Sequence, residues 1–361
     1  MQKICVIGTV GVPASYGGFE TLVDKLIESD AVKFTVYCSS RHYIERLVSY
    51  KNCQLVYIPF LKANGVMSIF YDIVSIIHAF VGGHRNFLVL GVSGALIFPL
   101  LKLVPRVRLV TNIDGLEWRR SKWGKPAKFL LRFFEKIAVK FSDSIIADND
   151  AISDYVRSEY HCGCETIAYG GDHAVDVRSL SQASMHVDQP IGKRYAFGLC
   201  RIEPENNVHI ILEAFSKHGE QLIFVGNWNN SEYGKDLYRR FSNNKNILLL
   251  DPIYCLDSLY NYRNNCSFYV HGHSAGGTNP SLVEMMHFGK SIVAYDCIFN
   301  RNTMENHGIY FDTVESLYQR LSLSIDGSDG EALLQVAKRR YVWHIVREQY
   351  INLFSKDLFS V

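Results

Sequence analysis

The sequence predicts an α/β protein with two Rossmann-like domains, each a doubly wound parallel sheet, that face each other across a cleft. Short apolar runs of strand type alternate with amphipathic helical stretches along the 361 residues. The alternation occurs twice, in residues 1–178 and again in residues 190–335, and the polar stretch 179–193 between them is the best candidate for a linker. A chain of this length suits two domains of ordinary size.

Each half is expected to supply the strands of one sheet. The first half predicts strands at Lys3–Thr9, Phe34–Cys38, Gln54–Ile58, Phe87–Gly91, Arg108–Ile113 and Ser144–Ala147. The second half predicts strands at Tyr195–Cys200, Gln221–Val225, Asn246–Leu250, Cys266–Val270 and Ser291–Tyr295. Helical spacing of apolar residues predicts a helix at Phe19–Ile27 and another at Lys125–Phe141.

Composition excludes several classes of protein. Lys plus Arg number 38 and Asp plus Glu 36, a near balance that argues against a general nucleic-acid binder. The nine cysteines are odd in number and lie mostly in apolar runs, which favours a reducing cytoplasm. Cys162 and Cys164 lack a second pair at ligand spacing, so no zinc site is expected. The N-terminus does not have the pattern of a signal peptide.

One apolar stretch, Phe87–Val104, raises the question of a membrane span. Glycines, a proline and Lys102 interrupt it, and it is short for a span of about 20 residues. We therefore expect a strand, a turn and a buried helix.

The stretch His271–Lys290 joins a strand to a glycine-rich loop and a helix. Asn279 suits the N-cap of that helix, and Gly276 and Gly277 carry no Cβ atom that would hold a ligand away from the backbone. Free N–H groups and the helix dipole together attract phosphate. Glu284, one turn into the helix, could then accept a hydrogen bond from a sugar hydroxyl. A glycine turn before an ordinary core helix would give the same pattern.

Three further loops follow predicted strands. Gly8–Glu20 matches neither the dinucleotide fingerprint nor a Walker loop, but it ends in Gly17 and Gly18 at a helix start, a second place for a phosphate or sugar. A purely structural turn is the alternative. Asn112–Lys125 places Asp114 directly after a strand, where its carboxylate would face the cleft or cap a helix.

Aromatic and basic residues follow in the same regions. Trp118 and Trp123 offer flat apolar surfaces that stack on sugars or anchor at interfaces. Arg201, in the loop RIEPENN, is placed for a bidentate contact with an anionic ligand.

The four motifs GTVGVPASYGGFE, NIDGLEWRRSKW, CRIEPENN and HGHSAGGTNPSLVEMMHFG, in this order, resemble the bacterial family 4 glycosyltransferases of the rhamnosyltransferase-like group. The likeness covers nearly the whole chain. It implies a GT-B fold, a nucleotide sugar held mostly by the C-terminal domain, an acceptor met by the N-terminal domain, retention of anomeric configuration and no required metal or other cofactor. It also implies that the last segment, 336–361, is a helix that crosses back to the N-terminal domain.

The resemblance assigns roles residue by residue. Arg201 matches the family's diphosphate-binding Arg, and Asn206 stands where a Lys is usual. Glu284 matches the second of two glutamates eight positions apart, while Gly276 occupies the place of the first, so His273, Thr278 or Asn279 would take its part. The donor site expected from all motifs comprises Gly17, Gly18, Arg201, Asn206, His273, Gly276, Gly277, Thr278, Asn279, Ser281 and Glu284.

These assignments predict transfer of a sugar, with dTDP-L-rhamnose as the favoured donor, to a lipid-linked glycan in the synthesis of a cell-surface polysaccharide such as O-antigen or capsule. Arg201 would stabilise charge on the leaving diphosphate, and Asp114 would orient a sugar or stabilise charge. Asp114, Arg201 and Glu284 are the expected catalytic residues. A sugar-nucleotide epimerase or phosphorylase of the same fold, or an inactive carbohydrate-binding homologue, are the alternatives.

The charge pattern of the helix Lys125–Phe141 indicates where in the cell the protein is located. Opposite its apolar face lies a strip of four basic residues, Lys128, Arg132, Lys136 and Lys140, and like charges at this spacing favour an anionic partner. Upstream residues enlarge the patch, and the acceptor or membrane-facing set is Trp118, Arg119, Arg120, Trp123, Lys128, Arg132, Lys136 and Lys140, with Lys122 beside it. We expect a cytoplasmic protein held peripherally at the inner face of the cell membrane. An ordinary soluble surface helix is the alternative.

Overall fold

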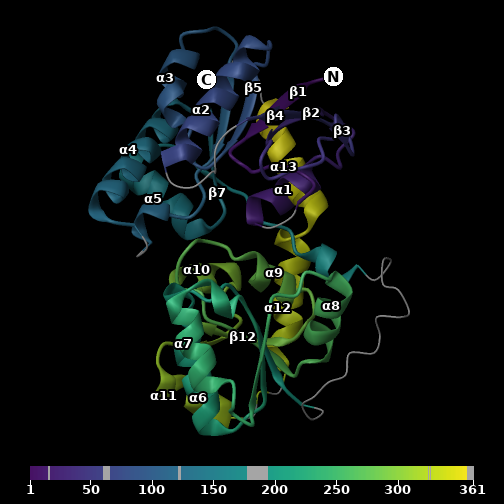
Figure 1. Ribbon diagram of the computed structural model, residues 1–361, viewed down its shortest axis with the longest axis vertical. Helices are drawn as coiled ribbons and strands as arrows, with labels where there is room; N and C mark the ends of the chain where they lie inside the picture. Colours follow the sequence, from purple (N-terminus) through teal and green to yellow (C-terminus); the bar gives the residue numbers. More distant parts are fainter. Residues whose placement is uncertain are drawn as a thin grey trace. The chain divides into compact units, whose positions relative to one another are not determined.

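A computed structural model describes residues 1–14, 17–59, 66–120, 123–176, 194–323, 325 and 327–355. The chain forms two compact units, Met1–Tyr169 with Trp343–Val361, and Gly170–Val342 (Figure 1). The first unit therefore ends earlier than residue 178, and the second extends beyond residue 335. The stretch 179–193, expected to be a linker, lies wholly outside the described residues.

The first unit contains an eight-stranded sheet, counted over the described residues, in the order β3-β4-β2-β1-β5-β6-β7-β8. Its strands are β1 (Lys3–Ile7), β2 (Lys33–Ser39), β3 (Ser49–Tyr50), β4 (Cys53–Ile58), β5 (Asn86–Leu90), β6 (Arg108–Asn112), β7 (Ser144–Ala147) and β8 (Glu165–Thr166). All neighbouring strands are parallel except the edge pair of β3 and β4. The central strands are buried on both faces, which explains their continuous apolar sequences.

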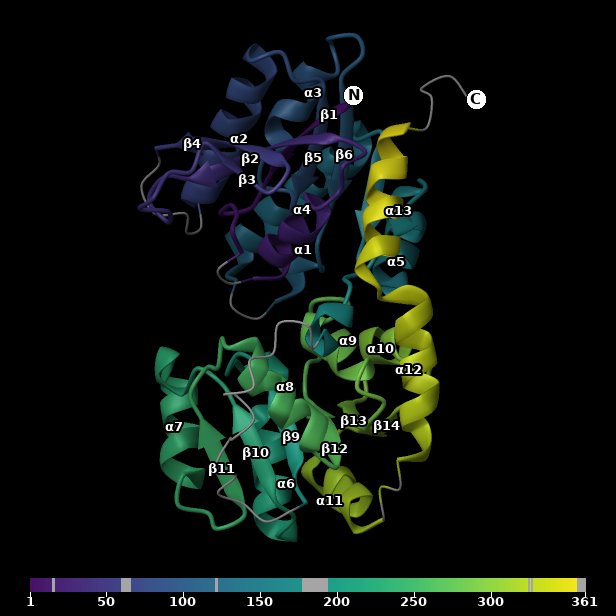
Figure 2. The same cartoon turned by 90° about the vertical axis from the view of Figure 1, so that its right-hand side faces the viewer.

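Helices cover both faces of this sheet. They are α1 (Gly18–Leu26), α2 (Val66–Val81), the 3₁₀ turn η1 (Ala95–Ile97), α3 (Phe98–Leu101), η2 (Glu117–Arg119), α4 (Lys125–Phe141), α5 (Asp150–Tyr160) and α13 (Trp343–Ser355). The last helix, α13, packs on α1 and β6 (Figure 2). Tyr350 of α13 accepts a hydrogen bond from Asn112 Nδ2 at 2.7 Å, and Arg347 pairs with Glu28 at 2.7 Å. The C-terminal helix thus belongs to the N-terminal unit.

The second unit contains a six-stranded sheet, again counted over the described residues, in the order β11-β10-β9-β12-β13-β14, with all pairs parallel. Its strands are β9 (Ala196–Leu199), β10 (Leu222–Val225), β11 (Ile247–Leu250), β12 (Phe268–His271), β13 (Ser291–Tyr295) and β14 (Ile309–Phe311). Its helices are η3 (Asp172–Val175), η6 (Pro204–Asn206), α6 (Val208–His218), η7 (Trp228–Asn230), α7 (Glu232–Phe241), α8 (Leu256–Asn265), α9 (Pro280–Met286), α10 (Ile298–Thr303), α11 (Val314–Ser322) and α12 (Ser328–Arg340).

Most of the expected elements are confirmed to within two residues, but the stretch Phe87–Val104 is only partly as expected. Its helix, α3, buries Phe98 and Leu101, yet Leu100 is 60% exposed and Leu103 is 78% exposed. This helix therefore has one buried face and one apolar face in contact with solvent. Among the described residues, no helix has both the length and the apolar character that a membrane span requires.

Candidate functional site

Two loops of the second unit lie at the point where the strand order of its sheet reverses, between β9 and β12. The strand β9 pairs with β10 on one side and with β12 on the other, so the loops that follow β9 and β12 emerge at the same edge. Ligands of open parallel sheets bind outside the carboxyl ends of strands at such a point.

Hydrogen bonds tie these two loops together. Ser274 donates to the Glu205 carbonyl oxygen through its N–H at 3.1 Å and through Oγ at 2.8 Å. Asn207 Nδ2 donates to the Gly272 carbonyl oxygen at 2.9 Å. A Cβ at Gly272 would overlap the Asn206 carbonyl oxygen, so only glycine permits this approach. The loops therefore form a single cross-linked rim, which we call the β9/β12 rim.

The glycine loop ends as the sequence predicts. Asn279 caps α9, because its Oδ1 accepts from the Ser281 N–H at 3.0 Å and from Ser281 Oγ at 2.7 Å. Gly276 and Gly277 have φ values of 99° and 76°, which favour glycine. Gly276 is exposed, and a Cβ there would meet no atom within 4 Å. Position 276, where the resemblance led us to expect a glutamate, is thus open to solvent on this unit.

Arg201 lies on the rim, and its side chain is 46% exposed. Its nearest carboxylate in the described residues is that of Glu203, 3.8 Å away, so the guanidinium is accessible to a ligand anion. Asn206 differs from the expectation of a diphosphate contact. It is buried, and its Nδ2 donates to the Arg201 carbonyl oxygen at 2.7 Å, so it positions the Arg201 loop instead.

Glu284 is held by two basic side chains of its own unit. Its carboxylate pairs with the buried guanidinium of Arg263 on α8 and lies 3.3 Å from His173 Nε2 on η3. Burial alone would raise the pKa of Glu284, but Arg263 and His173 outweigh it and lower the pKa to about 2. The carboxylate is therefore ionised and fixed in orientation.

Sequence reasoning did not identify Arg263 or His173. Arg263 lies in the polar helix LDSLYNYRNN, and His173 lies in a stretch assigned to the other domain. Neither carries a local motif, so only the fold brings them to Glu284.

The remaining residues expected at the donor site have different environments. Thr278 is buried, and its Oγ1 lies 3.3 Å from that of Thr303. His273 stacks on His271 with ring centroids 4.5 Å apart. His271 is buried, neither of its ring nitrogens has a partner among the described residues, and burial lowers its pKa to about 3. His271 is therefore neutral near pH 7.

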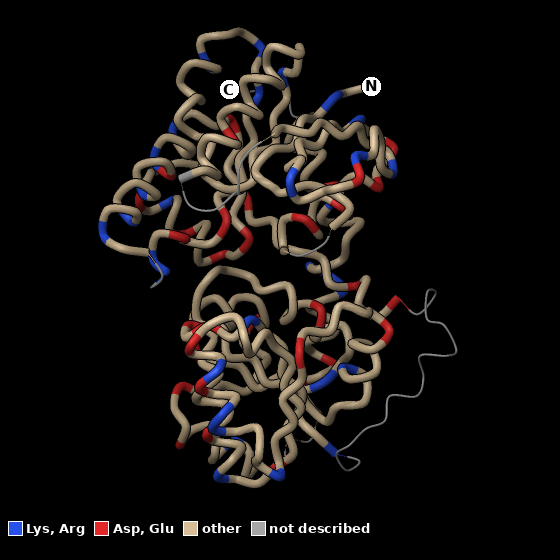
Figure 3. Tube along the Cα trace, in the orientation of Figure 1, with Lys and Arg blue, Asp and Glu red and all other residues tan. Residues whose placement is uncertain are grey.

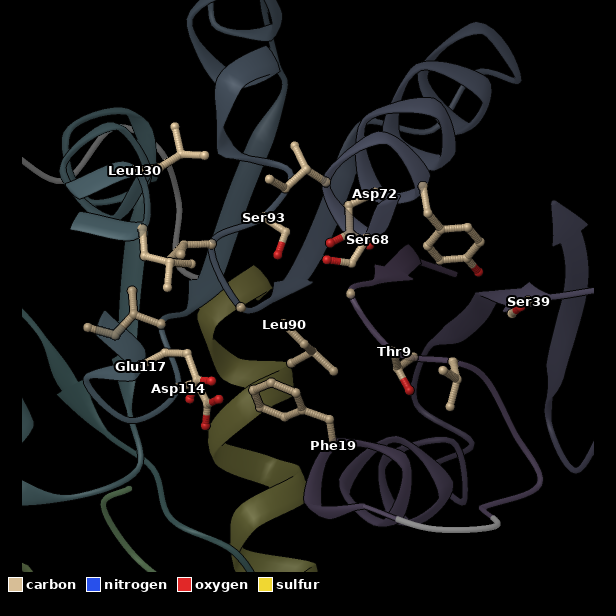
Figure 4. Close-up of a pocket in the computed structure, with 18 of the residues that line it drawn as sticks. Thr9, Phe19, Ser39, Ser68, Asp72, Leu90, Ser93, Asp114, Glu117 and Leu130 are labelled. Atoms are coloured by element: carbon tan, nitrogen blue, oxygen red, sulfur yellow. The ribbon is translucent and has the colours of Figure 1, made fainter. Parts of the chain in front are cut away.

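The first unit has a cavity of about 420 Å³ at the corresponding point of its own sheet, where β1 lies between β2 and β5 (Figure 4). Gly8 follows β1 and lies against the backbone of Leu90 on β5. A Cβ at Gly8 would overlap the Leu90 carbonyl oxygen, so only glycine permits this contact. The lining comprises Gly8, Thr9, Val10, Phe19, Glu20, Ser39, Ser68, Ile69, Tyr71, Asp72, Leu90, Gly91, Val92, Ser93, Ile113, Asp114, Glu117, Trp123, Ala127, Leu130 and Leu131. We call this cavity the β1/β5 pocket.

Asp114 lines this pocket, as expected of a carboxylate that follows a strand. Its φ is 63°, a left-handed conformation that Asp tolerates better than most residues, and its N–H donates to Asn112 Oδ1 at 2.9 Å. The N-cap of the following turn is Leu116, so Asp114 does not cap it. Gly17 and Gly18 form the start of α1 in the same unit.

The residues expected to meet the acceptor or membrane separate into two groups. Trp123 lines the β1/β5 pocket and donates from Nε1 to Glu117 Oε1 at 3.1 Å, while Arg120 pairs with the same carboxylate at 3.1 Å. Trp118 is instead part of an internal cluster. It donates from Nε1 to the buried Glu135 at 3.1 Å, and the guanidinium of Arg119 lies over its ring.

The basic strip on α4 is also less uniform than expected. Arg132 pairs with Glu159 of α5 at 2.6 Å and lies over the Trp118 ring, so its charge has a partner within the chain. No ion pair with a described residue is found for Lys128, Lys136 or Lys140. Lys122 lies outside the described residues.

The nine cysteines are free thiols. Among the described residues, no group of three or more His, Cys, Asp and Glu side chains is arranged to hold a metal ion.

Comparisons with known proteins agree with this architecture. Residues 1–172 match a family described as a domain of unknown function (DUF1972). No curated protein sequence matches the chain. Similar solved structures include sucrose-phosphate synthase from Thermosynechococcus elongatus, with 14% identity, a TM-score of 0.79 and 99% of each chain covered.

Two other similar structures were solved with nucleotides. HepE from Anabaena, in complex with UDP, has 13% identity and a TM-score of 0.74 over 99% of this chain and 100% of its own. The catalytic domain of starch synthase IV from Arabidopsis thaliana, bound to ADP and acarbose, has 11% identity and a TM-score of 0.70 over 98% and 99%. The expected fold class is confirmed: the chain has the GT-B fold, with two Rossmann-like α/β domains.

Proposed function

We propose that this protein is a glycosyltransferase that moves a hexose from a nucleotide sugar, with dTDP-L-rhamnose as the favoured donor, to a lipid-linked glycan in polysaccharide synthesis. The observation that carries the proposal is the β9/β12 rim, where the accessible guanidinium of Arg201 and the cross-linked glycine loop lie at adjacent strand ends. Fixed positive groups of this kind suit a diphosphate. Structures of similar fold were solved with UDP and with UDP-glucose.

The chemistry follows from these positions. When the anomeric C–O bond breaks, negative charge grows on the leaving diphosphate, and the positive charge of Arg201 stabilises it. In a retaining front-face reaction the departing phosphate oxygen takes the proton of the acceptor hydroxyl, so no separate base is required. Glu284, ionised and fixed by Arg263, accepts hydrogen bonds from donor hydroxyls. Asp114 in the β1/β5 pocket orients the acceptor.

Thermal-shift measurements with UDP, GDP and dTDP sugars test the donor assignment. A bound donor at concentration c stabilises the folded chain by RT ln(1 + c/Kd), so at equal concentration the tighter donor raises the melting temperature more. We expect the largest rise with dTDP-rhamnose, and stabilisation by UDP or GDP sugars alone would overturn the rhamnose assignment. Turnover of the donor without acceptor would indicate an epimerase, and binding with no transfer to any acceptor pool would indicate an inactive homologue.

A lipid-linked acceptor is supported by an exposed apolar surface on the first unit. The turn η1 contacts both α2 and α4, and α3 packs on α4. The solvent-facing side chains of this surface are Phe70, Val74, Ile77 and Val81 on α2, Leu96, Leu100 and Leu103 around α3, and Phe129, Leu130 and Phe133 on α4. Of these helices α4 carries the Lys and Arg residues, at Lys125, Lys128, Arg132, Lys136 and Lys140, and Lys102 directly follows α3 (Figure 3). Apolar side chains fringed by cations suit an anionic bilayer surface.

Cosedimentation with vesicles tests this attachment. We expect binding to anionic vesicles at low salt and release at high salt, because each cation near such a surface contributes about 1 kcal/mol. Changing Lys128, Lys136 and Lys140 together to Gln should weaken binding, whereas the same change at Lys217, Lys235 and Lys245 of the second unit should not. Equal binding by both triple variants would refute a role for α4.

A further inference from the structure

The side chains that line the β1/β5 pocket in the described part of the chain and can carry a charge near neutral pH are all carboxylic acids. Among the described residues that line it there are four carboxylic acids, Glu20, Asp72, Asp114 and Glu117, and no Lys, Arg or His. The β9/β12 rim, by contrast, presents Arg201. The described lining therefore offers an anion no cationic side chain.

Three of the four acids already have partners. Glu20 Oε1 accepts from Thr9 Oγ1 at 2.9 Å and from the Val10 N–H at 3.1 Å. Glu117 accepts from Trp123 Nε1 and pairs with Arg120. Asp114 is engaged as well. These three carboxylates help to hold the pocket walls in place.

Asp72, on α2, is different. It is only 5% exposed, and its carboxyl group makes no hydrogen bond or ion pair with any residue that the structure describes. Figure 4 shows its side chain pointing into the cavity next to Ser68, with Asp114 and Glu117 on the opposite wall. Burial raises the pKa of Asp72 to about 8. A buried polar group without a partner is costly, and such groups are kept where a ligand supplies the partner.

The other walls of the pocket are apolar or carry hydroxyl groups. Ile69, Leu130 and Leu131 provide apolar surface. Ser68 and Ser93, labelled in Figure 4, provide hydroxyls. A sugar ring matches this combination, since its C–H groups pack on apolar side chains and its hydroxyls donate and accept hydrogen bonds. The volume of about 420 Å³ lies in the range of small-molecule sites.

We propose that the β1/β5 pocket binds the acceptor as an uncharged, hydroxyl-bearing sugar, with Asp72 as the residue that hydrogen-bonds an acceptor hydroxyl. The inference rests on the proposed transferase function and narrows its acceptor class. A uronic acid or a sugar phosphate is disfavoured, because its charge would lie beside these acids and the described lining contributes no cationic side chain. In a lipid-linked acceptor, the phosphate groups of the carrier lie outside the pocket.

Calorimetric titration of the full chain with paired octyl glycosides tests this class of ligand. The neutral set is the glucoside, galactoside, mannoside and rhamnoside, and the acidic set is the glucuronide and galacturonide. We expect at least one neutral glycoside to bind and the acidic ones to bind at least about tenfold more weakly, because their carboxylate would lie beside the acids of the pocket. Equal or tighter binding of an acidic glycoside, or no binding by the neutral set, would overturn the proposal.

The variant Asp72→Asn tests the anchor. We expect it to weaken binding of the neutral glycoside about tenfold, to raise the acceptor KM and to leave donor-induced thermal stabilisation unchanged. Asp236→Asn, at an exposed acid of α7, is the matched control and should change none of these. Unchanged glycoside binding in Asp72→Asn would refute the hydrogen bond that we assign to Asp72. If no nucleotide sugar stabilises the unaltered protein, the transferase function itself is contradicted. Failure of the proposed acceptor site and failure of the proposed function can therefore be told apart.

Discussion

The two units use the same sheet topology at their binding edges but fill it differently. At the β9/β12 rim, hydrogen bonds cross-link two loops, and the buried acid Glu284 is matched by Arg263. At the β1/β5 pocket the edge is hollow and acidic, and the buried acid Asp72 has no partner in the described residues. Topology thus fixes where a ligand binds, while charge and packing decide whether that ligand is an anion or a neutral sugar.

The largest expected effect comes from removing one member of the matched pair. Glu284→Ala leaves the Arg263 charge buried and uncompensated, and we expect a loss of about 3–5 kcal/mol of unfolding free energy. Urea or thermal denaturation measures it. The double variant Glu284→Leu with Arg263→Met should recover most of the stability without recovering donor affinity. If Glu284→Ala is as stable as the unaltered protein, the pair does not have the structural role inferred for it.

The next effect concerns catalysis at the rim. Arg201→Ala removes charge stabilisation that grows in the transition state, so we expect kcat to fall about a hundredfold or more. The melting temperature should change little, because the Arg201 side chain is 46% exposed. Arg239→Ala, on the surface of α7, is the control and should keep normal kcat. A near-normal kcat in Arg201→Ala would remove Arg201 from the leaving-group role.

The unmatched acid of the pocket should affect stability in a pH-dependent way. The pKa of Asp72 is about 8 in the folded chain, against about 3.9 when unfolded. As pH rises between these values, the unfolded chain has released a proton that the folded chain still holds, so stability falls. Asp72→Asn removes this loss and should gain about 3–4 kcal/mol more at pH 8 than at pH 5. Denaturation at both pH values measures the difference, and an equal gain at both would show that Asp72 is not buried as a neutral acid.

The smallest expected effect is a loss of stability at low pH caused by His271, opposite in direction to the effect of Asp72. Burial lowers the pKa of His271 to about 3, against about 6.5 when unfolded. As pH falls from about 6.5, the unfolded chain takes up a proton that the folded chain resists, so stability is lost on the acid side. His271→Leu should reduce the loss between pH 7 and pH 5 by about 2 kcal/mol. The same acid slope in both proteins would indicate that His271 gains a partner or solvent access on protonation.

The sequence by itself determined the alternating strands and helices, the two-domain α/β class and several local features. Continuous apolar runs at β1 and β5 and the exact bounds of α4 follow from periodicity. The Asn279 cap follows from the preference of a single side chain. Asp114 was placed at a binding edge because a polar residue after a parallel strand lies there. These features depend on residues that are close together in the chain.

Only the tertiary structure decided which distant residues meet. The sequence assigned residues up to 178 to the first domain, but His173 belongs to the second unit and contacts Glu284. The sequence predicts that Asn206 contacts the donor, but its side chain is buried and donates a hydrogen bond to the Arg201 carbonyl oxygen. The helix α2 has apolar residues nearly all round, so no periodicity singled out Asp72. Burial and partners are set by packing between segments far apart in sequence, and no local pattern encodes them.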